Sequence, residues 1–173
     1  MAEVRLEPRI AFRVPVYAPC VSPDKFAGLS EEEIGALEAW RGNRKVKLAE
    51  LFKIEGDAPA EAEDVVIRLS GDLVKLRQVG FEMGSGRIIV EGDIGLLLGE
   101  HMRGGEIIVH GDAGSWLGAR MRGGRIEVHG SAGDYVGSAY RGARDGMRGG
   151  SIIIHGDAGY ELGNYMRGGS IEG

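Results

Sequence analysis

The stretch "HMRGGEIIVHGDAGSWLGARMRGG", residues 101–124, ends almost as it begins. Met-Arg-Gly-Gly occurs at 102–105 and again at 121–124, and an apolar run, a Gly-Asp pair and a Leu-Gly pair lie between the two copies. Its glycines could belong to a ligand-binding loop or to a repeated scaffold. The rest of the chain decides between these interpretations, because internal repeats show themselves by a constant spacing.

The markers of this stretch recur at a fixed interval. Five methionines follow one another at spacings of 19, 19, 26 and 19 residues: Met83, Met102, Met121, Met147 and Met166. Five glycines are spaced by 19, 19, 19 and 26 residues: Gly80, Gly99, Gly118, Gly137 and Gly163. The extra seven residues lie around "YRGARDG" (140–146), and we expect this insertion to project as a loop from one side. Residues 63–173 are therefore predicted to form one repeat domain.

Each repeat contains one predicted strand, and these strands lie at 87–91, 106–110, 125–129 and 151–155. Alternation places their Ile and Val side chains on an inner face. The remainder of each repeat is too short and too rich in glycine for a helix of normal length. We therefore predict a mainly β fold, a single-stranded parallel β-helix of about five 19-residue coils. The five glycines are expected at its turns, where a positive φ or close backbone approach is needed.

Residues 1–62 have an ordinary composition and are predicted to form an N-terminal cap or docking segment with one or two short helices. Ser30 and Glu33 have the spacing of a capping box. We expect a helix over 31–41 that ends at Gly42-Asn43, and a second short helix over 47–52.

Composition excludes several classes of protein. The net charge is −5 and the isoelectric point is about 5.4, which argues against a general binder of nucleic acid or anionic membranes. The single cysteine, Cys20, rules out an internal disulfide and fits a reducing compartment. No apolar stretch is long enough to span a bilayer, and the first residues lack the apolar core of a signal peptide. We therefore expect a soluble, cytoplasmic protein.

One set of outward-facing side chains is the candidate interaction site. His110, His129 and His155 occupy equivalent positions in successive repeats, next to the aliphatic column Ile89, Ile108 and Ile153. Stacked histidines point in parallel rather than converging on one point, so an interface is favoured over a metal site. An exposed aliphatic column indicates either a docking face for a partner or a surface that the N-terminal segment covers.

No catalytic, cofactor-binding or metal site is predicted in this chain. The glycine-rich stretches are neither a P-loop nor a dinucleotide-binding fingerprint, because no Gly-Lys-Ser/Thr occurs and no helix follows them. Cys20 has no identifiable base. Two ladders of opposite charge, one of Arg and one of Asp, recur with the repeat. The aspartates are expected to organise their own Gly-Asp turns through bonds to nearby backbone N–H groups.

The repeat "GRIIVEGDIGLLLGEHMRGGEIIVHGDAG" (86–114) resembles the GXGXG repeat of the glutamate synthase C-terminal domain and of the C subunit of formylmethanofuran dehydrogenase. The segment "VSPDKFAGLSEEEIGALEAWRGNRKVKLAELFKIEG" (21–56) is similar to the one that precedes the repeat in the dehydrogenase family, so this family is favoured. The resemblance implies that the β-helix is right-handed. It also implies a non-catalytic structural subunit of an oxidoreductase complex that reduces CO2 and forms N-formylmethanofuran in archaeal methanogenesis.

The same resemblance implies the partners and cofactors. We expect a molybdopterin-type B subunit with a molybdenum or tungsten bis-pterin centre and iron–sulfur clusters, and a metallohydrolase-type A subunit with a binuclear metal site. The alternatives are the C subunit of a formyltransferase/hydrolase complex, which lacks the redox centre, and a glutamate-synthase-type spacer. Family members carry the repeat beyond the equivalent of "GGSIEG" (168–173), so we expect either a truncated or variant chain or a partner at that end.

Overall fold

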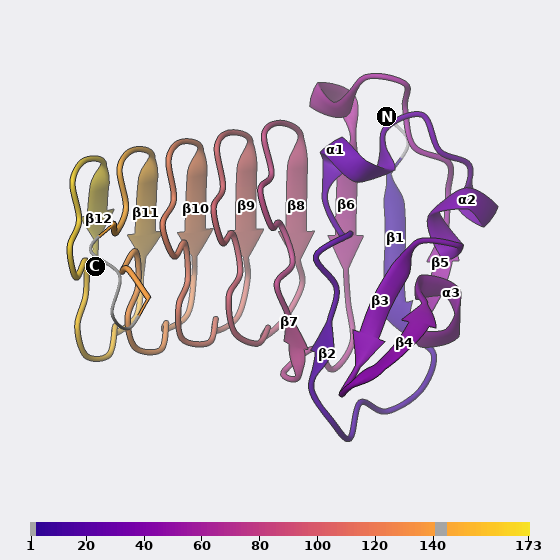
Figure 1. The fold of residues 1–173 in the computed structure, drawn as a ribbon, viewed down its shortest axis with the longest axis horizontal. Coiled ribbons are helices and arrows are strands. Elements are labelled where there is room, and N and C mark those ends of the chain that lie inside the picture. Colours follow the sequence, from indigo (N-terminus) through magenta and orange to yellow (C-terminus); the bar gives the residue numbers. More distant parts are fainter. Residues whose placement is uncertain (1–2, 141–144) are drawn as a thin grey trace.

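A computed structural model describes residues 3–140 and 145–173 and places the repeat strands side by side in chain order (Figure 1). An eight-stranded sheet has the order β12-β11-β10-β9-β8-β6-β1-β5. All neighbours in it are parallel except β1 and β5. Its strands are β1 (Val4–Pro8), β5 (Phe52–Glu55), β6 (Val66–Leu69), β8 (Arg87–Val90), β9 (Glu106–Val109), β10 (Arg125–Val128), β11 (Ser151–Ile154) and β12 (Ser170–Glu172).

A second sheet of four strands has the order β4-β3-β2-β7. Its strands are β2 (Val16–Tyr17), β3 (Glu38–Arg41), β4 (Arg44–Lys47) and β7 (Leu76–Arg77). Only the pair β2–β7 is parallel, and the other two pairs are antiparallel. Isolated parallel bridges then join equivalent residues of successive repeats from Leu73 to Ala132.

The predicted single-stranded right-handed parallel β-helix is wrong as a description of this fold. The strands form two sheets, and both sheets mix parallel with antiparallel neighbours. The difference arises in the segment before residue 62, which is predicted to be partly helical and supplies five strands. Two of them, β1 and β5, lengthen the sheet of repeat strands, and the other three form the second sheet with β7. These five strands lie outside the repeats, so the 19-residue spacing does not predict them.

The predicted helix over 31–41 is correct only in its first half. α2 (Glu31–Gly35) begins with the expected capping box, in which Ser30 accepts from the Glu33 N–H and Glu33 accepts from the Ser30 N–H. The chain then enters β3, and Gly42-Asn43 connects β3 to β4 as a two-residue hairpin turn. Gly42 has a φ of +61°, as such turns require. The prediction of a helix stop at Gly42-Asn43 is wrong, because this pair is a hairpin signal.

Three further helical segments are short. α1 (Pro23–Phe26) is capped by Ser22, α3 (Leu48–Leu51) lies where the second helix is predicted, and η1 (Ala62–Asp64) is a 3₁₀ turn. No helix in the described ranges, 3–140 and 145–173, is both long and apolar enough to cross a membrane.

The inner face of the eight-stranded sheet carries the predicted aliphatic columns. Ile107 and Val109 are fully buried, as are their equivalents in β8 and β10. Four of the five repeat methionines are also fully buried, and Met166 packs half-buried against the same core. Because β1 and β6 pair in register, residues from the segment before residue 62 belong to this core too. The division of the chain into two domains at residue 62 stays a prediction.

The five repeat glycines adopt φ values between +61° and +76°: Gly80, Gly99, Gly118, Gly137 and Gly163. A positive φ alone does not explain why these positions are glycine. Trp116 and Tyr135, two residues before Gly118 and Gly137, adopt φ of +64° and +62° with large side chains. The side-chain space at the glycines is already filled. A Cβ added at Gly118 would lie 2.6 Å from Cδ1 of Ile152 in the next repeat. Glycine is therefore needed because a neighbouring isoleucine occupies the space.

The aspartate ladder links successive repeats. Asp93 accepts from the Asp112 N–H at 2.7 Å, and Asp112 accepts from the Ser131 N–H at 2.8 Å. The aspartates are predicted to act within their own turns, and these two instead bond to the backbone one repeat further along. The predicted insertion around 140–146 falls largely on residues 141–144, which lie outside the described residues.

Candidate functional site

The outer face of the eight-stranded sheet, opposite the buried columns, holds the predicted interaction residues. Ile89, Ile108 and Ile153 lie in register along its centre, with Glu127 between the last two. Ile89 is buried, with 8% of its surface exposed, and the other two isoleucines are half-buried. The column is therefore less exposed than the sequence suggested, and a role as an interface stays a prediction.

Charged side chains border this aliphatic column on one side. Glu106 forms ion pairs with Arg87 and Arg125, both at 3.0 Å. Arg125 also contacts Glu127 at 3.2 Å. These pairs run across three neighbouring strands and flank the isoleucines with alternating charge. The centre of the outer face is thus a mixed column, in which Arg68 and Glu127 lie in register with the isoleucines, and ion pairs border it.

The three histidines border the column on the other side. The ring centroids of His110 and His129 are 5.2 Å apart and those of His129 and His155 are 5.1 Å apart, with near-parallel rings in the second pair. His155 Nε2 lies 2.8 Å from Glu127 Oε2. This hydrogen bond, with help from Arg125, lowers the pKa of Glu127 below its ordinary value. All three histidines are exposed to solvent.

The histidine column does not gather metal ligands. Within residues 3–140 and 145–173, no group of three or more His, Cys, Asp or Glu side chains could hold a metal ion. Stacked rings present their nitrogens side by side, whereas tetrahedral coordination needs them to converge. The column can donate and accept hydrogen bonds along an edge of the outer face.

An aromatic cluster on the repeats is absent from the predictions made from the sequence. Trp116 and Tyr135 are stacked at 4.5 Å between ring centroids, with an angle of 18° between the rings. They line a hollow of about 460 Å³ together with Ala139, Glu161 and Asn164. The sequence contains one sign of this cluster: Trp116 and Tyr135 are 19 residues apart, so they occupy equivalent positions in successive repeats. It is easily missed because aromatic residues are not expected in the left-handed backbone conformation that both adopt.

Two neighbouring titratable side chains are Glu100 and His101, and the His101 ring lies 6.0 Å from the Tyr140 ring, which is 5.8 Å from Trp116. Glu100 is 7% exposed, and burial raises its pKa although it accepts from the Gln78 amide at 3.2 Å. Burial also lowers the pKa of His101, whose ring contacts Phe81 edge-on at 5.8 Å. Perturbed pKa values mark functional candidates, but the Glu100 carboxylate is already engaged by Gln78.

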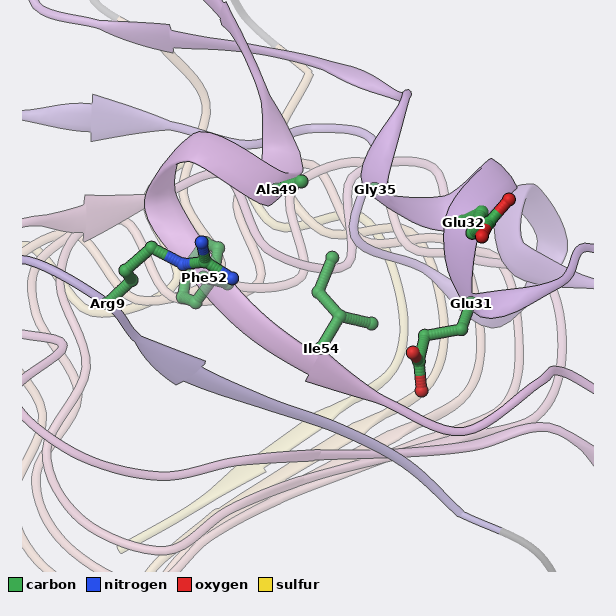
Figure 2. Close-up of a pocket in the computed structure, with 7 residues that line it drawn as sticks. All are labelled: Arg9, Glu31, Glu32, Gly35, Ala49, Phe52 and Ile54. Carbon is green, nitrogen blue, oxygen red and sulfur yellow. The ribbon is translucent and has the colours of Figure 1, made fainter.

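Figure 2 shows a second hollow, of about 290 Å³, between α2, α3 and β5. Its lining is Arg9, Glu31, Glu32, Gly35, Ala49, Phe52 and Ile54. Glu31 accepts a hydrogen bond from the Gly56 N–H at 2.8 Å, so this carboxylate already serves the local fold. One cation, two carboxylates and an apolar floor offer a small polar contact site and contain no nucleophile with an adjacent base.

Cys20, the one thiol of the chain, lies apart from both hollows. It is 8% exposed, and burial raises its pKa to about 11. A nucleophilic cysteine requires the opposite shift. The structure therefore places Cys20 in the core beside α1, and none of the predicted site residues lies with it.

Curated relatives match a little over half of the chain, whereas no family model matches it. The C subunit of the molybdenum-containing formylmethanofuran dehydrogenase 1 of Methanosarcina barkeri is 44% identical over 96 residues, which are 56% of this chain and 32% of the relative. The C subunit of the tungsten-containing formylmethanofuran dehydrogenase 2 of Methanothermobacter wolfeii is 46% identical over 99 residues, 57% of this chain and 37% of the relative.

A solved structure shares the fold. It is the crystal structure of the formyltransferase/hydrolase complex from Methylorubrum extorquens in complex with methylofuran. One of its chains matches with a TM-score of 0.86 and 35% identity, over 96% of this chain and 61% of that chain. This chain spans about a third of the length of the curated relatives that it matches. The resemblance to the C subunit of formylmethanofuran dehydrogenase, expected from residues 21–56 and 86–114, is therefore confirmed.

Proposed function

We propose that this chain is the C subunit of a formylmethanofuran dehydrogenase, the complex that reduces CO2 and forms N-formylmethanofuran. The observation that carries the proposal is the 44% identity to the C subunit of Methanosarcina barkeri over more than half of this chain. The names of that relative and of the Methanothermobacter wolfeii relative specify molybdenum and tungsten enzymes. In this proposal the metal centres belong to other subunits, and the chain itself contributes structure rather than catalysis.

The outer face is the proposed contact with those subunits. Ile108 and Ile153, with Glu127 between them, supply the centre of this contact. The Arg87–Glu106–Arg125 pairs supply one rim, and the histidine column supplies the other. The proposed partners are a molybdopterin-type B subunit and a metallohydrolase-type A subunit. Half-buried isoleucines within a polar rim support this choice of surface, because burial of such a centre stabilises association.

A second function is favoured by the structural comparison. The match to the formyltransferase/hydrolase complex extends over 96% of this chain, further than the matches to the curated dehydrogenase subunits. The chain would then be the C subunit of a complex that transfers formyl groups without a redox centre. The metal content of the complex separates the two functions, because only the dehydrogenase needs molybdenum or tungsten.

The test is affinity purification of the tagged full chain from its native source, followed by mass spectrometry and metal analysis. We expect the A-type and B-type subunits in stoichiometric amounts, with molybdenum or tungsten. Formyl-transfer activity without either metal would establish the second function. A chain that purifies alone, or with an amidotransferase or synthase, would contradict both.

A pair of variants tests the surface within the same experiment. Ile108→Glu should lower recovery of the partner subunits by about tenfold or more, because it replaces a half-buried apolar contact of the proposed interface with a charge beside Glu127. Val74→Glu is the matched control, since it adds the same charge at Val74, which is 59% exposed outside this face. Equal recovery with the two variants would show that the outer face is not the contact.

A further inference from the structure

A column of arginines lies along one edge of the repeats, three residues before strands β9, β10, β11 and β12. Its members are Arg103, Arg122, Arg148 and Arg167. They are in register, because the N–H of each donates to the carbonyl oxygen of the methionine one repeat earlier, at 2.6–2.7 Å. Their backbones are about 4.8 Å apart, the spacing of paired strands, so their like charges repel and a carboxylate among them is stabilising. We call these four residues the arginine column.

One carboxylate of the chain already occupies the far half of this column. Asp145 lies 3.4 Å from Arg148 and 3.7 Å from Arg167. It also lies 3.5 Å from Arg120, which is beside the column. Asp145 belongs to the seven-residue insertion and not to the repeat pattern. The structure therefore contains one example of the group that the column binds.

A second carboxylate lies before the first arginine. Gly84 holds the column position one repeat before Arg103, and its N–H donates to Asp24 at 2.9 Å rather than to a methionine carbonyl. Asp24 comes from α1, in the segment before residue 62, and its carboxylate lies more than 4.0 Å from the Arg103 guanidinium. Carboxylates from outside the repeat pattern thus lie at both ends of the column.

The middle of the column has no carboxylate partner. The described part of the chain includes every Asp and Glu, and none of them lies within 4.0 Å of the guanidinium nitrogens of Arg103 or Arg122. Arg103 donates to the backbone carbonyl oxygen of Glu82 at 3.4 Å. Arg122 is exposed and lies in "RMRGGR" (120–125), which has three positive charges and no acidic residue in a chain of net charge −5.

His101 reports the charge of this region. Burial lowers its pKa, and the charges of Arg120 and Arg122 lower it further, against the opposite effect of Glu82. A carboxylate bound at Arg122 opposes the effect of both arginines, so binding there raises the pKa of His101. This histidine is therefore a probe, within the chain itself, of whether the site is occupied.

We propose that the middle of the arginine column, Arg103 and Arg122, binds an acidic segment of another subunit, as Asp145 occupies the end of the column. Guanidinium groups pair with carboxylates through two parallel hydrogen bonds, which gives the contact its geometry. Arg122 is three residues before Arg125 of the outer face, within about 10 Å along the chain, so one partner can reach both surfaces. A nucleic acid is a poorer occupant, because the net charge of −5 repels a long polyanion.

The first experiment titrates the full chain with the capped peptide Gly-Asp-Glu-Asp-Gly and follows the pKa of His101 by NMR. This pKa should rise by about 0.3 or more at saturating peptide, because a neighbouring carboxylate stabilises the protonated ring. The capped peptide Gly-Asn-Gln-Asn-Gly is the matched control and should leave the pKa unchanged. An equal rise with inorganic phosphate at the same concentration would overturn the proposal, because the site would then bind any small anion.

Three chain variants locate the site. Arg122→Gln should weaken binding of the acidic peptide about threefold, the size of one exposed ion pair. Arg44→Gln is the matched control, since Arg44 is also exposed and has no carboxylate of the described residues within 4.0 Å. Asp145→Asn should tighten binding about threefold, because it releases Arg120 and Arg148 from their own carboxylate. Equal weakening by the two arginine variants, or no tightening by Asp145→Asn, would contradict the proposal.

A second experiment identifies the source of the segment, which rests on the proposed function, whereas the chemistry of the site does not. Carbodiimide joins an amine to a carboxylate in contact with it and does not react with a guanidinium. In the purified complex, Arg122→Lys should therefore cross-link to an Asp or Glu of a co-purified subunit, whereas Arg44→Lys should not. A complex without this cross-link, or a cross-link to a second copy of this chain, would overturn the proposal. A chain that purifies without partners yet binds the acidic peptide would contradict the proposed function alone.

Discussion

The segment before residue 62 and the repeats after it form neighbouring strands of one sheet by different means. In the repeats, one set of contacts recurs from repeat to repeat: an isoleucine packs over a glycine, a methionine is buried, and an aspartate bonds to the backbone of the next repeat. The segment before residue 62 has no recurring contact and relies on local devices such as the Ser30 capping box and the Gly42-Asn43 hairpin. β1 joins the two by pairing in parallel with β6.

This difference shows where close backbone approach matters. In the repeats many glycines have the backbone of the neighbouring repeat directly beside them. Gly123 is one example, since an added Cβ would lie 2.3 Å from the carbonyl oxygen of Arg103. A Cβ added at Gly28, in the first segment, would have no atom within 4 Å. Glycine is favoured at this position because its φ is +76°.

The largest expected loss of stability comes from adding a methyl group where the backbones of two repeats are in contact. Gly123→Ala should lower the free energy of unfolding by about 3 kcal/mol or more, because a backbone oxygen cannot move away as a flexible side chain can. Gly28→Ala should cost only about 1–2 kcal/mol, the strain of a left-handed backbone. Urea unfolding of both variants measures the comparison. Equal losses would show that the repeats are not packed backbone against backbone.

Removing one hydrogen bond from each region should lower the free energy of unfolding by similar amounts. Asp112→Ala removes the acceptor for the Ser131 N–H, and Ser30→Ala removes the acceptor for the Glu33 N–H. Each should cost about 1 kcal/mol. Exchange of the Ser131 amide should accelerate in Asp112→Ala and stay close to normal in Asp112→Asn, which retains an acceptor. An unchanged Ser131 amide in both would contradict the link between repeats.

The smallest effect concerns the pH dependence of the outer face. The pKa of Glu127 is lowered in the folded chain, chiefly by the hydrogen bond with His155, so its ionised form stabilises the fold. This contribution is present above the ordinary pKa of 4.5 and is lost as the pH falls through the lowered value. Glu127→Gln should therefore be less stable than the parent chain near pH 6 and equal to it at strongly acidic pH. A difference that grows on acidification would refute the pairing.

The repeat is the most predictable part of the molecule. Alternation correctly places Ile107 and Val109 inside, and the Ser30–Glu33 spacing correctly indicates a capping box. The sequence does not show that residues 38–41 leave the helix, because their preference is decided by pairing with β2 and β4. Nor does it show the stacked Trp116 and Tyr135, since their backbone conformation is imposed by the stacking of repeats. Local pattern identifies a strand, whereas its neighbours in the sheet follow from tertiary contacts.

Unfolding followed from both regions at once tests most directly whether the first segment and the repeats form one cooperative unit. Cys20 reports on the first segment, because burial raises its pKa to about 11 and suppresses its reaction with thiol reagents at pH 8. Trp116 reports on the repeats once Trp40, the other tryptophan, is replaced by Phe. We predict coincident urea midpoints for Cys20 reactivity and Trp116 fluorescence. A Cys20 thiol that becomes reactive while Trp116 keeps its native emission would contradict the continuous sheet.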